Sequence, residues 1–114
     1  LSSSAIIELV VDIVRKHNLF PLVVDPVMVA KGGDQLLKGD AVEVLRTKLI
    51  PIATVVTPNI PEAEVLTGHS IKTVAEARQA ASDIVDRLGA KTVALTPPLG
   101  SRDLLESAGH SGRK

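Results

Sequence analysis

The sequence predicts an α/β fold in which helices surround a central parallel sheet. Helix-like and strand-like segments alternate along the chain, and this alternation is typical of parallel strands joined by right-handed helical crossovers. The first strand-like segment is a nearly unbroken apolar run, as expected of a strand that is buried on both faces. The 114 residues, of which 45% are hydrophobic, suit one domain with a core. We therefore expect a three-layer αβα arrangement within residues 1–96.

The first two elements are predicted to be a helix and a strand. Apolar residues recur at intervals of three and four after a serine cluster that can cap a helix, which indicates an amphipathic helix ending near His17. Residues 19–24 form an apolar run that Asp25 and Pro26 close, and we expect the first strand there. The apolar residues of the helix are Ile6, Leu9, Val10, Ile13 and Val14.

The middle of the chain predicts a second helix and a second strand. Asp40 can cap a helix whose apolar side chains fall on one side, and Pro51 is expected to end it because proline lacks a backbone N–H. Residues 53–57 (ATVVT) follow shortly after this proline. They are expected to be the next strand of the sheet.

Two more helices and a third strand are expected after residue 60. Pro61 suits the first turn of a short helix, and Gly68 suits its left-handed end. Residues 73–76 (TVAE) have the pattern of a capping box and begin a longer helix, which Gly89 follows. Residues 91–95 complete the series as a strand.

The composition changes at residue 97. Residues 97–114 are rich in proline, glycine and serine, and the one short apolar stretch among them is too short for a stable isolated helix. We expect a divergent, disordered tail there. Because the chain opens on Leu1 and its one methionine is Met28, we also expect it to be a piece of a longer protein.

Composition excludes several classes of function. Thirteen basic residues balance thirteen acidic ones, so no net field attracts nucleic acid or an anionic membrane. Phe20 is the only aromatic residue, which removes the stacking surface that single-stranded nucleic acid needs. The absence of cysteine excludes disulfides and thiolate chemistry. No apolar run approaches the roughly 20 residues that cross a bilayer, and we expect a cytoplasmic setting.

Two motifs place polar groups just after a predicted strand. They are residues 23–33 (VVDPVMVAKGG) and residues 57–64 (TPNIPEAE). Because parallel strands deliver their carboxyl ends to one crevice, we expect Asp25, Asn59 and Glu62 to converge. One or two carboxylates with an amide oxygen suit Mg²⁺, which keeps several of its waters, and phosphoryl transfer from ATP requires such an ion.

Ordinary structural roles could explain the same residues. Asn59 with Glu62 three positions later is also a helix-capping pattern, and Asp25 before a proline is a common turn former. Residues 31–33 (KGG) could close over phosphates or form a solvated turn. The three histidines are isolated from one another in the sequence, and we assign them no chemistry.

Together the two motifs resemble the hydroxymethylpyrimidine and phosphomethylpyrimidine kinases, members of the ribokinase-like superfamily. The resemblance covers residues 1 to about 95 and makes residues 1–96 a partial kinase domain. It implies ATP-dependent phosphorylation of hydroxymethylpyrimidine or its phosphate in thiamine biosynthesis, with ATP and Mg²⁺, and a homo-oligomer. It also implies that Met28 and Val27 contact the pyrimidine, although Met28 would serve equally in core packing.

The sequence departs from the family in three places. Members of the family begin earlier, with a strand and loops that contact the pyrimidine. After the third strand they carry Lys-Gly-Gly-His, where this chain has residues 96–99 (TPPL). The glycine-rich turn with the catalytic base has no counterpart here, and a general base typically contributes about 10² to 10⁴ in rate. We therefore expect an incomplete domain with little activity and no catalytic residue of its own.

Two other classes of function remain open. The first is a catalytically inactive module that binds metal or phosphate weakly, or associates with a complete subunit. The second is a dinucleotide-binding domain, which the absence of a Gly-x-Gly-x-x-Gly motif argues against.

Overall fold

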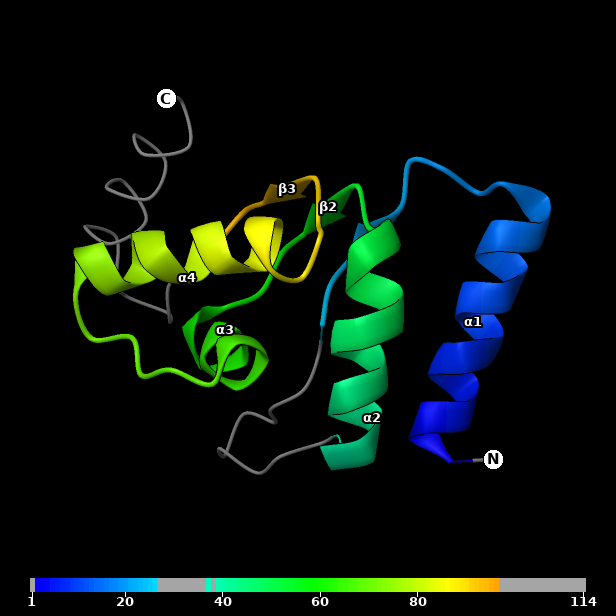
Figure 1. Cartoon of the computed structure of the whole chain (residues 1–114), viewed down its shortest axis with the longest axis horizontal. Helices are drawn as coiled ribbons and strands as arrows, with labels where there is room; N and C mark the ends of the chain where they lie inside the picture. Colours follow the sequence, from blue (N-terminus) through cyan, green and yellow to red (C-terminus); the bar gives the residue numbers. More distant parts are fainter. Residues whose placement is uncertain (1, 27–36, 38, 97–114) are drawn as a thin grey trace.

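The sheet has three short parallel strands. The computed structural model describes residues 2–26, 37 and 39–96 (Figure 1). The strands are β1 (Val23–Val24), β2 (Val55–Val56) and β3 (Thr92–Val93), and they lie side by side in the order β1-β2-β3. The prediction of a parallel sheet is therefore confirmed. The tail expected at residues 97–114 lies outside the described residues.

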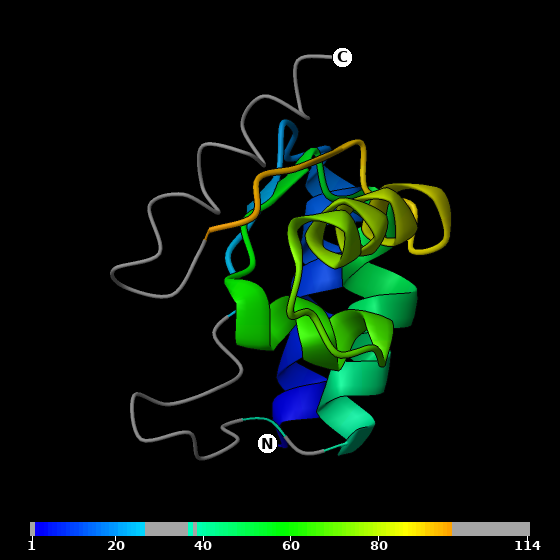
Figure 2. The same ribbon diagram turned by 90° about the vertical axis from the view of Figure 1, so that its left-hand side faces the viewer.

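Four α-helices are described, and they lie beside the sheet. Figure 2 shows α1, α2 and α4 on one side of the strands, so the described residues form the sheet and one helical layer. The chain between β1 and β2 holds α2, a π-helical turn and a 3-10 turn. The bounds are α1 Ser3–His17, α2 Gly39–Val44, π-helical turn Leu45–Leu49, 3-10 turn Ile50–Ile52, α3 Ile60–Thr67 and α4 Val74–Asp86.

The ends of α1, α3 and α4 follow the predicted signals. The Ser2 hydroxyl accepts a hydrogen bond from the Ala5 N–H at 3.1 Å and caps α1. Gly68 ends α3 with φ +77°, the left-handed conformation that glycine adopts at low cost. The capping box expected at residues 73–76 is present, because Thr73 and Glu76 each accept from the backbone N–H of the other at 3.1 Å.

The helix between β1 and β2 differs from the prediction at both ends. It begins at Gly39, so Asp40 lies in its first turn rather than at the cap. Pro51 does not end it, because the chain continues through the π-helical turn into a 3-10 turn where proline occupies an early position that needs no donor. Gly89 packs closely on Pro51: it has φ +89°, and a Cβ there would lie 3.3 Å from the Pro51 Cα.

Each strand is shorter than its apolar run. Pro21 has no N–H to give to a ladder, which limits β1 at its start. Sheet-like hydrogen bonds nevertheless continue past the strand ends. The Thr57 N–H donates to the Val24 carbonyl at 3.0 Å, and the Thr96 N–H donates to the Pro58 carbonyl at 3.0 Å.

The core lies between the sheet and the helices. Val24 and Val56 point into it, whereas the next row across the sheet, Val23, Val55 and Thr92, lies on the opposite face. The side chain of Arg46 ties two helical segments together, since its Nε donates to the Leu66 carbonyl at 2.8 Å. The largest fully buried side chains are Ile50, Leu66, Ile84, Val56 and Pro58.

Most of the apolar stripe predicted for α1 is exposed. Val11 and Val14 are buried, at 5% and 4% exposure. Val11 belongs to the core cluster, and Ile7 packs against that cluster. The other four residues of the stripe are exposed by 40% to 50%: Ile6, Leu9, Val10 and Ile13. The periodicity identified the helix correctly, but α1 is apolar over more of its circumference than α2 covers (Figure 1).

Candidate functional site

The candidate site lies where the three strands end. Asp25 directly follows β1, Asn59 follows β2, and Thr96 follows β3. Because the strands are parallel, all three residues lie at the same edge of the sheet. We call Asp25, Asn59, Glu62 and Thr96 the carboxyl edge. Ligands of open α/β sheets bind at this end of the strands.

The register fixes the order of these residues along the edge. Val24 is opposite Val56, so Asp25 is level with Thr57 on the neighbouring strand. Asn59 forms a parallel bridge with Thr96, two positions further along. Neighbouring strands are about 4.8 Å apart, which is short enough for side chains on adjacent strands to share a ligand.

Asn59 and Glu62 hold one another at the start of α3. The Glu62 N–H donates to the Asn59 Oδ1 at 2.9 Å, and the Asn59 N–H donates to the Glu62 Oε1 at 2.9 Å. The capping role considered for this pair is therefore present. It leaves the Asn59 side-chain amide donors outside the capping bonds and fixes the direction of both side chains.

Burial distinguishes this capping box from the one at the start of α4. Glu62 is 5% exposed and is the one charged residue in the described part of the chain that is buried, whereas Glu76 of the other box is exposed. A carboxylate is costly to bury, and the positive end of the α3 dipole offsets part of that cost. A cap on its own does not require a buried carboxylate.

Asp25 provides the second carboxylate of the edge. Its side chain is exposed, although Val24 before it and Pro26 after it are buried. The buried neighbours hold the backbone at this place while the carboxylate stays accessible to a ligand. Two hydroxyls missed in the sequence lie at the same end of the strands: Thr57 and Thr96 donate to the Val24 and Pro58 carbonyls at 3.5 and 3.4 Å. Their position directly after an apolar run was the available signal.

The donor set suits a hydrated hard cation rather than a closed metal cage. Across residues 2–26, 37 and 39–96, no group of three or more acidic or histidine side chains lies close enough to hold a metal ion. Mg²⁺ takes one or two carboxylates and completes its shell with water and substrate phosphates. Asp25 and Glu62 with the Asn59 amide oxygen match that requirement in type.

The remaining predicted residues lie elsewhere or are not described. Val27, Met28 and residues 31–33 fall outside the described part of the chain. Two clefts of about 440 Å³ each are present, one between α4 and β3 and one between α4 and the turn after α3, and the carboxyl edge lines neither. No described helix is long and apolar enough to cross a membrane.

Comparison with known proteins relates the chain to one family. A family model described as phosphomethylpyrimidine kinase matches residues 1–103. The hydroxymethylpyrimidine/phosphomethylpyrimidine kinase of Haemophilus influenzae is 48% identical over 93 residues, which is 82% of this chain and 34% of that protein. The thiamine biosynthesis bifunctional protein ThiED of Geobacter sulfurreducens is 55% identical over 74 residues, 65% of this chain and 15% of that protein.

Solved structures give the same fold. A phosphomethylpyrimidine kinase from Clostridium difficile superposes with a TM-score of 0.76 at 41% identity, covering 87% of this chain and 43% of that one. A Staphylococcus aureus pyridoxal kinase in complex with AMP-PCP and pyridoxal gives 0.69 at 32% identity, covering 89% of this chain and 34% of that one. The predicted ribokinase-like fold class is confirmed. The chain spans about a third of the length of the first of these curated relatives.

Proposed function

Because this chain belongs to the phosphomethylpyrimidine kinase family, we propose that it supplies the metal- and phosphate-binding edge of an ATP-dependent pyrimidine kinase of thiamine biosynthesis. The reaction transfers the γ-phosphoryl group of ATP to the hydroxyl of hydroxymethylpyrimidine, or to the phosphate of its monophosphate. The buried Glu62 at the carboxyl edge is the observation that carries the proposal. The S. aureus neighbour in complex with AMP-PCP supports the use of a nucleotide.

Each residue of the edge has a proposed part. Asp25 and Glu62 hold a hydrated Mg²⁺, and the Asn59 amide orients the phosphate oxygens beside it. When bound, the ion neutralises charge that spreads over the transferring phosphoryl group. Val27 and Met28 contact the pyrimidine. We assign the proton acceptor for the substrate hydroxyl to no residue of this chain.

The capping box contributes pre-organisation to this arrangement. Its two 2.9 Å bonds fix Asn59 and Glu62 before any ligand arrives, so little side-chain entropy is lost on binding. The fixed backbone ladder to Thr96 holds the same turn from the side of β3. We therefore expect nucleotide affinity to depend on the residues of this turn more than on the rest of α3.

The second candidate is a catalytically inactive module that associates with a complete subunit. The observation that favours it is the run of exposed apolar side chains between residues 6 and 23, which suits an interface. Both candidates share the carboxyl edge, and they differ in whether the chain alone forms product. A cytoplasmic location and a homo-oligomer accompany the first candidate by analogy with the family.

The two capping boxes provide a matched test of the edge. Asn59→Ala and Thr73→Ala each remove one capping box, so both should lose about 1 kcal/mol of stability. Only Asn59→Ala should weaken binding of AMP-PCP with Mg²⁺, by about 10- to 100-fold, as loss of a supporting group at a metal site typically does. Isothermal titration calorimetry measures the affinity of each variant for AMP-PCP with Mg²⁺. If the two variants lose affinity equally, Asn59 and Glu62 serve only as a helix cap.

Activity separates the two candidate functions. Incubation with hydroxymethylpyrimidine, ATP and Mg²⁺, read by mass spectrometry, should give phosphorylated pyrimidine if the chain is a working kinase. Binding of AMP-PCP with no product favours the inactive module. Loss of both binding and product, in a chain that circular dichroism shows to be folded, rejects the carboxyl edge as a nucleotide site.

A further inference from the structure

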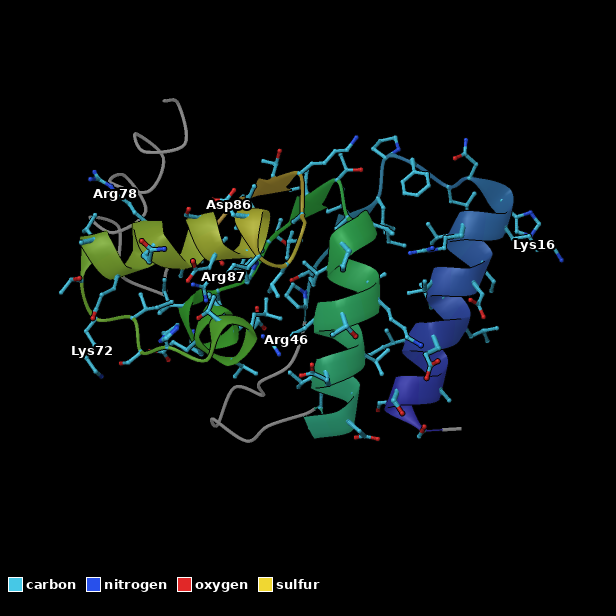
Figure 3. The ribbon with its side chains drawn as sticks, viewed as in Figure 1. Lys16, Arg46, Lys72, Arg78, Asp86 and Arg87 are labelled. Atoms are coloured by element: carbon cyan, nitrogen blue, oxygen red, sulfur yellow. The ribbon has the colours of Figure 1, made fainter. Side chains whose placement is uncertain are left out.

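Two basic side chains extend from the π-helical turn Leu45–Leu49 to different helices. Arg46 contacts α3, where its Nε donates to the Leu66 carbonyl at 2.8 Å. Lys48 contacts α1, where its Nζ pairs with the Glu8 Oε1 at 3.0 Å. Figure 1 shows α1 and α3 on the two sides of this helical segment, and Figure 3 shows Arg46 on the side of α3. The turn therefore links two helices through side chains of the same charge.

The contact of Arg46 is the more buried of the two. The Arg46 side chain is 32% exposed, whereas the side chains of Lys48 and Glu8 are 52% and 47% exposed. An exposed ion pair contributes little, because water and salt screen its charges. The bond from Arg46 ends on the backbone of Leu66, a residue that is 0% exposed. Of the two contacts, this one is better placed to fix a neighbouring helix.

The Leu66 carbonyl has no donor within α3 itself. The last backbone bond of the helix runs from the Gly68 N–H to the Glu64 carbonyl at 2.8 Å, so the carbonyls after Glu64 need partners from other segments. The last turn of α3 also has no basic residue of its own to complement the negative end of the helix dipole. Arg46 supplies both the donor and the positive charge from another segment.

One helical turn separates this contact from Glu62. Glu62 lies four residues before Leu66 on the same face of α3, about 6 Å away along the helix axis. In a regular α-helix the Leu66 N–H donates to the Glu62 carbonyl. Glu62 and Leu66 are both buried, at 5% and 0% exposure, so neither moves without its neighbours. A displacement of the last turn is therefore passed to the backbone of Glu62.

Helix α3 is too short to hold its own position. Isolated helices of eight residues are marginal in water, so its place depends on contacts with the rest of the fold. Ala63 and Leu66, both 0% exposed, hold it against the core, but apolar contacts are not directional. The hydrogen bond from Arg46 depends on distance and angle. It therefore fixes the last turn both along the helix axis and around it.

We propose that Arg46 is a positioning residue for the metal and phosphate site, and that it acts through α3 on Glu62. This inference rests on the function proposed above for the carboxyl edge. In this role Arg46 touches neither the ion nor the nucleotide. Its bond to the Leu66 carbonyl keeps Glu62 where the carboxylate can share the ion with Asp25. Lysine would replace it only in part, because the planar guanidinium holds Leu66 and Glu43 at once, whereas an ammonium is a single point on a flexible stem.

Hydrogen exchange of the whole chain tests the positioning step without any ligand. In Arg46→Met the capping amide of Glu62 should exchange about threefold faster, because the first turn of α3 opens more often. The capping amide of Glu76, at the start of α4, should keep its rate and serves as the internal control. Lys48→Met, from the same π-helical turn, should change neither rate. An unchanged rate at Glu62, or equal increases at Glu62 and Glu76, would show that Arg46 does not hold Glu62 in place.

Binding of AMP-PCP with Mg²⁺ to the whole chain tests whether Arg46 acts through Glu62. Arg46→Met should weaken binding about tenfold, as loss of a group that orients a metal ligand typically does. In the Glu62→Gln background the same change should alter affinity by less than about twofold, because the carboxylate that Arg46 positions is already absent. Arg46→Lys should recover part of the affinity, and Lys48→Met should keep all of it. Isothermal titration calorimetry measures each affinity, and circular dichroism verifies that each variant is folded.

Three binding results would overturn the proposal. The first is normal binding by Arg46→Met while Glu62→Gln binds weakly, which rejects the role of Arg46 and leaves the proposed function in place. The second is an equal loss in both backgrounds, which makes Arg46 a cap of α3 and nothing more. The third is no binding by the unaltered chain, which rejects the proposed function together with this inference. If Arg46→Met does not fold, Arg46→Lys takes its place in the same comparison and is judged by the same results.

Discussion

Helices α1 and α4 are similar in length but have different surroundings. In α4 the buried residues are Ala77, Ala80 and Ile84, and the exposed positions are polar apart from the small side chain of Ala75. In α1 the buried residues are Val11 and Val14, but large apolar side chains also cover an exposed face. The core of the described structure is thus complete around α4 and incomplete around α1. A regular apolar spacing identifies a helix without showing how many of its faces are covered.

The largest expected effect compares one side chain from each helix. Ile84 is fully buried in α4, and Ile84→Ala should lower the free energy of unfolding by about 2–5 kcal/mol, because truncation leaves a cavity. Leu9→Ala should change it by no more than about 0.5 kcal/mol, since half of that side chain is already in water. Urea unfolding measures both. A large loss for Leu9→Ala would mean that α1 is covered in solution.

The next effect concerns the close packing where α4 ends. Gly89 and Gly68 both have positive φ, but only at Gly89 would a Cβ meet a neighbour, Pro51 Cα at 3.3 Å. Gly68→Ala should cost about 1 kcal/mol for the backbone conformation alone. Gly89→Ala should cost more than that, by the amount needed to move Pro51. If thermal unfolding finds equal losses, the contact with Pro51 is loose.

The smallest of the three effects compares the helix starts. Thr73 caps α4 in a two-bond box that also fixes Lys72, whose N–H donates to Glu76 Oε1 at 2.7 Å. Ser2 caps α1 with a bond to the Ala5 N–H alone. Thr73→Ala should cost about 1 kcal/mol and Ser2→Ala less. Chemical denaturation followed by circular dichroism would show the order, and a reversed order would make α1 the firmer of the two.

Local sequence signals predicted most of the fold. Gly68, the TVAE box and the apolar runs located helix ends and strands, because each depends on backbone chemistry within a few residues. The predictions made from Asp40 and Pro51 for the ends of α2 were wrong. The helix begins at Gly39, so Asp40 lies in its first turn, and Pro51 lies early in a 3-10 turn, where the missing N–H is tolerated. The exposed face of α1 was not predictable, since burial depends on which elements surround a helix.

The position of the candidate site was predicted from the sequence, but the burial of its residues was not. That Asp25 and Asn59 share one edge follows from parallel pairing, which apolar runs indicate. The burial of Glu62 depends on how α3 packs, and no local pattern reports it. The roles of Asp25, Asn59, Glu62, Val27 and Met28 remain predictions for the binding experiments.

The hydrogen bond from Arg46 to the Leu66 carbonyl holds the last turn of α3, so both ends of this short helix are fixed. Its first turn is tied to β3 through the bridge between Asn59 and Thr96, and its last turn is tied to the π-helical turn by the Arg46 guanidinium. Eight residues of helix span about 12 Å. The tilt of α3 sets where the Glu62 carboxylate lies, so replacing a residue that contacts only the last turn of the helix can move a carboxylate at its first turn.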